Sequence, residues 1–226
     1  MNYAIIVAAG KSERMGPEVD KAFLSLGTKP VLAYSLTAFD RCPDIDGIIL
    51  VVRKDRVDAA RGLIQIYSCA KVKKIVAGGS QRQQSVLNGI EALSDDDVNI
   101  VAVHDGARPC ITPELISETI KAAKAHGSGV AAVKITDTVK SVDAHMNVDK
   151  TIDRTKLWAV QTPQTFKLDL LMKAFAVVKK KKAVVTDEAS AVELISGKVK
   201  LVPSMLSNIK ITTPEDLSLA AAFLKI

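Results

Sequence analysis

The amino-acid sequence predicts an α/β fold in which a parallel sheet carries helices on both faces. Short apolar runs alternate with amphipathic stretches over most of the chain, which is the pattern expected when strands and helices alternate in sequence. Of the 226 residues, 48% are hydrophobic but only 4% are aromatic, so the core has to be aliphatic. Abundant Val, Ile and Ala are typical of strands buried on both faces, as in a parallel sheet.

The strands are expected at the apolar runs. In chain order these are Tyr3–Ala8, Gly47–Val52, Lys73–Ala77, Asn99–Val103, Gly129–Ile135 and Val199–Val202. Apolar side chains recur at helical spacing between them, over residues 31–39, 86–93 and 115–123. Two helix starts are marked by an N-cap threonine, a proline in the first turn and early acids, at Thr112-Pro113 and at Thr213-Pro214.

The segment Lys134–Phe166 breaks this rhythm. It has no helical periodicity, it is polar, and it alternates only weakly. Loops of this length without structure are uncommon in compact domains and are usually functional. We therefore expect a long hairpin or arm that projects from a single domain covering residues 1–226.

Charge and cysteine content narrow the classes of partner. Lys and Arg number 31 against 25 Asp and Glu, a net charge of +6 that suits nucleic acid, an anionic membrane or phosphorylated small molecules. Basic residues are not interleaved with aromatic ones, and no apolar run reaches the roughly 18 residues of a membrane span, so neither nucleic acid nor membrane is expected. The three cysteines form no CxxC pair and the N-terminus lacks a signal peptide, which favours a reducing cytoplasm.

Three loops that follow strands carry the residues suited to phosphate chemistry. The first is Ala8-Ala9-Gly10-Lys11-Ser12, whose small residues let a ligand approach backbone N–H groups. A Walker A loop would need glycine where Ile5 stands, so that motif is excluded. Lys21 follows as a movable positive charge, although a lone lysine is usually solvent-exposed.

The other two loops are Gly78-Gly79-Ser80-Gln81-Arg82 and His104-Asp105-Gly106-Ala107-Arg108. Paired glycines before a polar helix start suit a base or a phosphate, although an ordinary turn with a cap has the same residues. Asp105 ends a central strand, where ligands of parallel sheets bind, and it is a candidate Mg²⁺ ligand or a turn cap. His104 is expected to be a packed ring.

Taken together, the loops resemble the 2-C-methyl-D-erythritol 4-phosphate cytidylyltransferase family over the whole chain. The motifs that carry the resemblance are Ala8-Ala9-Gly10 with Arg14-Met15 and Lys21, Gly78-Gly79 with Arg82 and Ser85, His104–Pro109, Asp137-Thr138, Asp153-Arg154, Thr162-Pro163-Gln164, Thr186–Ser190 and Asn208–Thr212. The resemblance implies a Rossmann-like nucleotidyltransferase fold and a homodimer in which the arm of one chain, residues 134–166, completes the active site of the other.

The resemblance also implies roles for individual residues. Nucleotide binding falls to Ala8, Ala9, Gly10, Lys11, Ser12, Gly78, Gly79, Ser80, Arg82, Ser85 and Gly106, and catalysis to Arg14, Lys21, Arg154 and Lys210. The acceptor phosphate is assigned to Asp105, Arg108, Thr138, Arg154, Thr162, Thr186 and Lys210, with Asp105 also a contact of Mg²⁺. The chain departs from the family pattern at Ser12, Asp20, Ala22 and Ser80, and Asp20 puts a carboxylate next to Lys21.

The implied reaction transfers CMP from CTP to 2-C-methyl-D-erythritol 4-phosphate by direct in-line attack, releasing pyrophosphate. The acceptor is already an anion, so the reaction needs positioning and charge neutralisation rather than a general base. Two alternatives stay open at this point: another polyol phosphate acceptor such as ribitol 5-phosphate, and a regulatory nucleotide-binding module that has lost turnover.

Overall fold

The computed structural model describes residues 1–10, 20–93 and 97–226. Within these ranges the central feature is a seven-stranded sheet of order β11-β7-β10-β6-β1-β4-β5. Its strands are β1 (Asn2–Ala8), β4 (Gly47–Val52), β5 (Val72–Ala77), β6 (Ile100–Asp105), β7 (Ser128–Lys134), β10 (Trp158–Lys167) and β11 (Leu201–Pro203). Neighbouring strands run parallel, except that β10 is antiparallel to both β6 and β7. The predicted α/β class with a mostly parallel sheet is confirmed.

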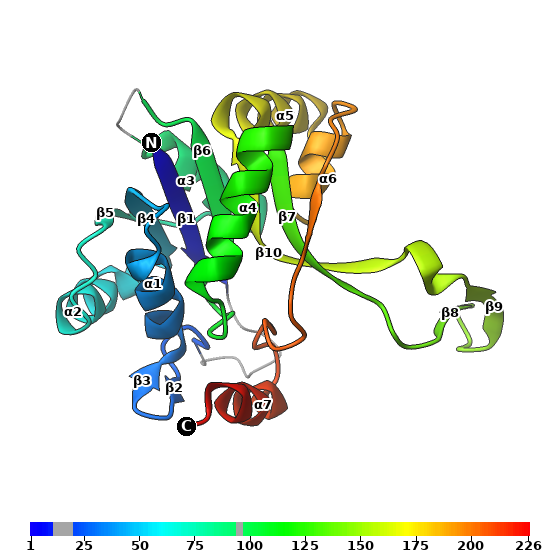
Figure 1. Ribbon diagram of the computed structural model, residues 1–226, viewed down its shortest axis with the longest axis horizontal. Coiled ribbons are helices and arrows are strands. Elements are labelled where there is room, and N and C mark those ends of the chain that lie inside the picture. Colours follow the sequence, from blue (N-terminus) through cyan, green and yellow to red (C-terminus); the bar gives the residue numbers. More distant parts are fainter. Residues whose placement is uncertain (11–19, 94–96) are drawn as a thin grey trace.

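Helices cover both faces of the sheet (Figure 1). The helices α1 (Val31–Arg41), α2 (Val57–Ile66) and α4 (Pro113–His126) pack on one face, against β1 side chains such as Ala4 and Ile6. The helices α3 (Arg82–Glu91), α5 (Leu168–Lys181) and α6 (Glu188–Glu193) pack on the other face, against Tyr3 and Ile5. Alternate residues of one strand thus enter opposite halves of an aliphatic core.

Local sequence signals place the helix ends. Thr112 caps α4 by accepting a hydrogen bond from the Leu115 N–H, and α4 ends where Gly127 takes a positive φ of 87°. Thr213 caps α7 (Pro214–Leu224) in a reciprocal capping box with Asp216. The α7 helix contributes Ala220 to a small third core beside the short β2–β3 hairpin (Ser25–Leu26 and Lys29–Pro30). Both predicted helix starts are confirmed.

One predicted strand, at residues 73–77, is less buried than expected. The run at residues 73–77 was expected to be a buried strand, but β5 lies at the edge of the sheet and its residues are half-buried or exposed. An edge strand has one neighbour instead of two, which leaves its lysines in solvent.

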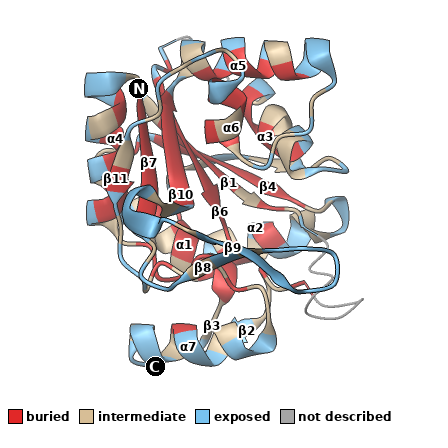
Figure 2. Cartoon of the chain, turned by 90° about the vertical axis from the view of Figure 1, so that its right-hand side faces the viewer, coloured by how far each residue is buried: buried red, intermediate tan, exposed pale blue. Residues whose placement is uncertain are grey.

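The arm is shorter than the predicted Lys134–Phe166. Residues 158–167 form β10, which is inserted between β6 and β7 and buried over its second half, because its side chains pack between the two helical layers. The part that leaves the body carries the hairpin of β8 (Val139–Val142) and β9 (Val148–Ile152) and the short helix η3 (Arg154–Lys156). Figure 1 shows this hairpin far from the sheet, and Figure 2 shows that almost all of it is exposed. Among the described helices, none is long and apolar enough to cross a membrane.

Candidate functional site

A cavity of about 610 Å³ lies at the carboxyl ends of β1, β4, β5 and β6. Three loops that the sequence singled out meet in it: Ala8–Gly10 after β1, Gly78–Ser80 after β5, and Asp105 with Ala107 at the end of β6. Carboxyl ends of neighbouring parallel strands share one sheet edge, which is why residues so far apart in the chain converge there.

The roof of the cavity is built from two loops in close contact. The Gly78 N–H donates to the Val52 carbonyl (2.8 Å), and the Gly79 N–H donates to Ser85 Oγ (3.1 Å). A Cβ atom on Gly78 would overlap the Cβ of Ala9, so the chain needs glycine here for the two loops to touch. The backbone is therefore the surface that this side of the cavity presents to a ligand.

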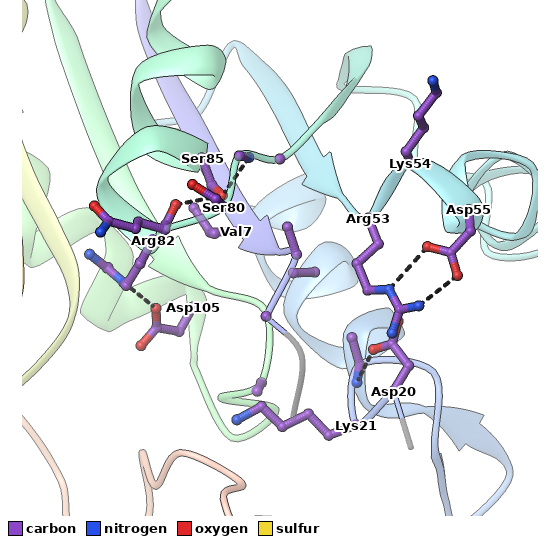
Figure 3. A pocket seen from close by; sticks show the side chains of 18 of the residues that line it. Val7, Asp20, Lys21, Arg53, Lys54, Asp55, Ser80, Arg82, Ser85 and Asp105 are labelled. Carbon is purple, nitrogen blue, oxygen red and sulfur yellow. Dashed lines mark hydrogen bonds and ion pairs between the residues drawn. The ribbon is translucent and has the colours of Figure 1, made fainter. Parts of the chain in front are cut away.

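One wall is a cluster of charges centred on Asp105. Its two carboxylate oxygens accept separate hydrogen bonds, one from Arg82 Nε (3.1 Å) and one from Lys210 Nζ (2.9 Å), and Arg108 Nε lies 3.8 Å away. Arg82 also forms a two-pronged pair with Glu188 at 2.6 and 3.0 Å. Figure 3 shows Arg82 and Asp105 facing each other at this side of the cavity.

The cations around Asp105 determine its charge state. Burial alone raises the pKa of Asp105, but the positive charges of Arg82, Lys210 and Arg108 outweigh burial and hold that pKa far below its usual range. Asp105 is therefore an anion at neutral pH, and its side chain keeps two cations at the cavity. Cations held next to a single carboxylate can transfer to the phosphate groups of a ligand.

Residues behind Asp105 hold it in place. The Asp105 N–H donates to Thr162 Oγ1 (3.1 Å), and Thr162 Oγ1 lies 3.0 Å from His104 Nδ1. Burial lowers the pKa of His104 to about 3, so the ring is neutral at pH 7, and it packs against Phe39 at 4.9 Å. His104 is the packed ring that the sequence predicts.

A second set of bonds ties the segment that carries Lys210 to the sheet. Arg108 Nη1 donates to the Asn208 carbonyl (2.8 Å). The Asn208 side chain in turn donates to Gln161 Oε1 (3.0 Å) and to the Thr162 carbonyl (2.9 Å). All four residues are buried, so the backbone two residues before Lys210 is immobilised.

The opposite wall contains Lys21 and the loop after β4. Arg53 forms a two-pronged pair with Asp55, with Arg53 Nη2 2.8 Å from Asp55 Oδ2, and Lys54 also lines the cavity. In Figure 3 the Lys21 amine extends into the cavity toward the side on which Asp105 lies. The two walls therefore offer positive charge from opposite directions, with the small residues of β1 between them.

Comparison with known proteins decides which family this site belongs to. The family model of 2-C-methyl-D-erythritol 4-phosphate cytidylyltransferase matches residues 2–226. The chain belongs to this family. A relative named as this cytidylyltransferase from Dehalococcoides mccartyi is 46% identical over 222 residues, which cover 98% of this chain and 95% of that protein. One from Alkaliphilus oremlandii is 43% identical over 222 residues, covering 98% and 94%.

Solved structures agree with this assignment. The crystal structure of 4-diphosphocytidyl-2C-methyl-D-erythritol synthase from Anaerococcus prevotii superimposes with a TM-score of 0.88 at 36% identity, over 100% of this chain and 96% of that one. The cytidylyltransferase from Thermus thermophilus superimposes with a TM-score of 0.81 at 28% identity, over 98% of both chains. The Rossmann-like fold expected from the resemblance is thus confirmed.

Most residues that the cytidylyltransferase family pattern singles out do meet at one cavity. Those that line it are Ala8, Ala9, Gly10, Lys21, Gly78, Gly79, Ser80, Arg82, Ser85, Asp105 and Lys210. The predicted residues Lys11, Ser12 and Arg14 lie outside the described residues.

Three predicted site residues are buried beside the cavity rather than in its lining. Gly106 packs under Ala8 and Leu32, where a Cβ would collide with the Leu32 side chain. Thr162 and Arg108 are only 3% and 9% exposed. Thr162 Oγ1 contacts Asp105 and His104, and Arg108 Nη1 donates to the Asn208 carbonyl, while Arg108 Nε is buried without a hydrogen bond to a described residue. Their predicted contact with a ligand stays a prediction, and in this structure they lie next to Asp105 and to the segment that carries Lys210.

The remaining predicted residues lie elsewhere. Thr138 and Arg154 are exposed on the arm, which Figure 1 shows projecting away from the central sheet, and neither residue lines the cavity of its own chain. Thr186 is exposed just before α6, with its Oγ1 3.4 Å from Ser190 Oγ.

Sequence reasoning missed Glu188, Arg53 and Asp55. Arg53 and Asp55 follow directly after β4. Loops at the carboxyl ends of neighbouring parallel strands meet at one edge of the sheet, so the position of these two residues after a predicted strand was a signal for the site. Glu188 sits within a family motif, but its burial against Arg82 is a tertiary contact between residues 106 positions apart that no local pattern reveals.

Proposed function

We propose that this protein transfers CMP from CTP to 2-C-methyl-D-erythritol 4-phosphate, giving 4-diphosphocytidyl-2-C-methyl-D-erythritol and pyrophosphate. The family match over residues 2–226 supports the reaction. The observation that carries it is the single cavity in which a backbone-lined roof, Ala8–Gly10 with Gly78–Ser80, faces the cations Lys21, Arg82 and Lys210.

CTP fits the side of the cavity formed by the two glycine-containing loops. The loops Ala8–Gly10 and Gly78–Ser80 present backbone groups and small side chains, which can hydrogen-bond the edges of a base and hold a ribose. A site built to bond a particular edge rejects bases that leave its polar groups unpaired. Cytosine selection is therefore assigned to these loops.

The acceptor phosphate fits the side of Asp105. Lys210 and Arg82 are already beside the cavity, and each shares the one Asp105 carboxylate. An incoming phosphate would accept hydrogen bonds from these two cations. Their positive charge would reduce the repulsion between the acceptor phosphate and the triphosphate of CTP. One phosphate oxygen of the acceptor then attacks the α-phosphorus of CTP, the bond to the β-phosphate oxygen breaks, and pyrophosphate leaves.

Lys21 is the described cation best placed to meet the charge that develops during transfer. It enters the cavity from the wall opposite Asp105, so the reacting phosphates lie between Lys21 on one side and Lys210 on the other. Positive charge preorganised where negative charge grows is the main source of rate in phosphoryl and nucleotidyl transfer. Arg14 is assigned the same role from the family pattern.

Magnesium is proposed to enter with CTP as part of the substrate. Among the described residues there is no group of three or more His, Cys, Asp or Glu side chains that could hold a metal ion. Asp105 is a suitable single carboxylate, but both of its oxygens accept hydrogen bonds from Arg82 and Lys210. Mg²⁺ would be held chiefly by the triphosphate, and Asp105 would contact it only after Lys210 moves to a phosphate.

The arm supports a homodimer in which each chain completes the site of its neighbour. Among the described strands, β8 and β9 pair with each other and with no third strand. The hairpin exposes Val142, Met146 and Val148 at 46%, 78% and 60%. A two-stranded hairpin is at best marginally stable alone in water. A twofold-symmetric partner would cover these side chains and bring Arg154 to the acceptor phosphate of the other chain.

The three cysteines are all free and buried, which suits the proposed reducing cytoplasm.

Pyrophosphate release tests the proposal. The protein is incubated with Mg²⁺ and each of CTP, UTP, ATP and GTP, against a panel of methylerythritol phosphate, ribitol 5-phosphate and erythritol 4-phosphate. We expect release only with CTP and methylerythritol phosphate, together with the cytidyl product. Equal turnover with ribitol 5-phosphate would reassign the acceptor, and tight CTP binding with no turnover would support a regulatory module instead.

A further inference from the structure

Asp20 is an unusual residue in this site because it is a buried acid next to Lys21. The residue is 6% exposed, and it replaces the proline that the family pattern has before this lysine. A carboxylate beside a catalytic lysine could restrain the lysine by direct pairing. The structure assigns it other partners.

The Asp20 carboxylate closes the turn that carries Lys21. Asp20 Oδ1 accepts a hydrogen bond from the Ala22 N–H (3.2 Å), and the Asp20 carbonyl accepts one from the Phe23 N–H (3.0 Å). This is a turn with aspartate at its first position, a favoured arrangement, and it leaves Lys21 at the corner. In Figure 3 the side chains of Asp20 and Lys21 point in different directions, and only that of Lys21 extends toward Asp105.

The chain after the turn is anchored to α1. The Ala22 carbonyl accepts from the Leu32 N–H (2.9 Å), and the Leu24 carbonyl accepts from the Val31 N–H (2.9 Å). Ala22 itself is only 3% exposed. These bonds fix the position of the backbone on the C-terminal side of Lys21.

The anchor on the N-terminal side is an ion pair. Asp20 Oδ2 lies 3.5 Å from Arg56 Nε, at the end of the short helix η2 (Lys54–Arg56) that follows β4. Both atoms are buried and neither makes a hydrogen bond to a described residue, so the attraction between the two side chains depends on charge rather than on a shared proton. The Arg56 guanidinium also lies over the Phe23 ring, 5.8 Å from its centre, and so reaches both ends of the turn.

We propose that Asp20 is a positioning residue for Lys21: its carboxylate ties the turn of residues 20–23 to Arg56 and thereby directs the lysine amine into the cavity. The inference rests on the proposed function, in which Lys21 meets the charge of the transition state. A shift of about 1 Å in a catalytic group can reduce the rate by as much as 10²-fold, so a loosened turn is expected to lower kcat.

The test is a double-mutant cycle on turnover of CTP and methylerythritol phosphate. Asp20→Ala removes both the acceptor of the Ala22 N–H hydrogen bond and the charge opposite Arg56. It should lower kcat about tenfold, with the KM for CTP changed less than about twofold. Asp20→Asn keeps an acceptor for the Ala22 N–H and should lose about threefold. In a Lys21→Ala background, Asp20→Ala should add less than about a twofold loss, because the group that it positions is gone.

Two further variants separate positioning from general stability. Arg56→Met keeps an unbranched apolar side chain but removes the guanidinium, and with it both the charge opposite Asp20 and the contact with the Phe23 ring. It should lower kcat at least as much as Asp20→Asn. Asp58→Asn is the matched control on α2, because the Asp58 side chain is 93% exposed and, among the described residues, forms its ion pair with Arg61 at the surface. It should leave kcat unchanged.

The pH profile gives a readout that a purely structural role would not move. Burial raises the pKa of Asp20, although the Ala22 N–H, Arg56 and Arg53 act in the opposite direction, and Asp55 adds to the rise. As pH falls through that raised pKa the carboxylate gains a proton and its attraction to Arg56 is lost. The wild-type kcat should therefore fall on the acid side toward that of Asp20→Asn, and Asp20→Asn should lack this limb.

The outcomes distinguish the two proposals. A wild-type protein that transfers no CMP refutes the proposed function and with it this role of Asp20. An active wild type in which Asp20→Ala reduces kcat by the same factor with and without Lys21, or in which it raises only the KM, refutes the positioning role alone.

Discussion

The buried pair of Arg82 and Glu188 allows a direct test of how the charge cluster is held. Glu188 has 1% of its side chain exposed and accepts two hydrogen bonds from Arg82, at 2.6 and 3.0 Å. Glu188→Gln keeps the shape but removes the charge, and it turns an amide NH₂ toward a guanidinium that has only donors. At least one of the two bonds is therefore lost.

The expected cost follows from burial on the two sides of the pair. Removing one partner of a fully buried pair costs about 3–5 kcal/mol. The Arg82 side chain is 26% exposed, and in the variant it still pairs with Asp105. The expected loss of stability is therefore that of one hydrogen bond to a charged group, about 2 kcal/mol. For a domain of this size that corresponds to a fall of about 6 °C in Tm.

The assay is urea unfolding at pH 7 followed by circular dichroism, with the midpoint and slope fitted separately. The slope should stay constant, which shows that stability rather than compactness has changed. The control is Glu118→Gln, which removes a pair of similar length, 2.8 Å to Lys121, from a site where the side chains are 57% and 67% exposed. Its midpoint should not move.

A midpoint for Glu188→Gln that matches Glu118→Gln would refute the reasoning. It would mean that Arg82 is held by Asp105 alone and that α6 contributes nothing to the charge cluster. A raised KM for methylerythritol phosphate should accompany the predicted loss of stability, since Arg82 then moves away from its place beside Asp105.

Three further predictions concern catalysis, pH and assembly. Lys21→Ala should lower kcat by about 10²–10³-fold with little change in CTP affinity, measured by steady-state kinetics and calorimetric titration; a change in KM alone would make Lys21 a binding residue. Asp105 has a lowered folded pKa, so its contribution to stability is complete above its ordinary pKa of 3.8 and is lost as pH falls through the folded value. The difference in unfolding free energy between wild type and Asp105→Asn should accordingly be constant from pH 7 to 5 and shrink below pH 4, and a difference that grows in acid would contradict this sign. Mixed Arg154→Ala and Lys21→Ala subunits should recover about a quarter of wild-type activity, because half of the dimers are hybrids with one intact site; no recovery after proven exchange would place Arg154 outside the neighbour's site.

The sequence by itself determined the fold class and the location of the site along the chain. Apolar runs with polar loops after them are local patterns, and in a parallel sheet the loops after neighbouring strands reach the same edge. Ala8–Gly10, Gly78–Ser80 and Asp105 were therefore predictable as one cavity, and they do line it together. Helix starts at Thr112 and Thr213 were predictable for the same reason, since caps act within one turn.

The tertiary structure alone decided which polar side chains line the cavity and which are buried behind it. The contacts of Thr162 and Arg108 with His104, Asp105 and Asn208, for example, could not be predicted from the sequence. Residues 158–166 were predicted as part of the arm because the segment 134–166 as a whole is polar and lacks helical periodicity. In the structure they belong to β10, which lies between β6 and β7 and is covered by both helical layers. Burial and ion pairing depend on residues far apart in the chain, so they appear only once the chain is folded.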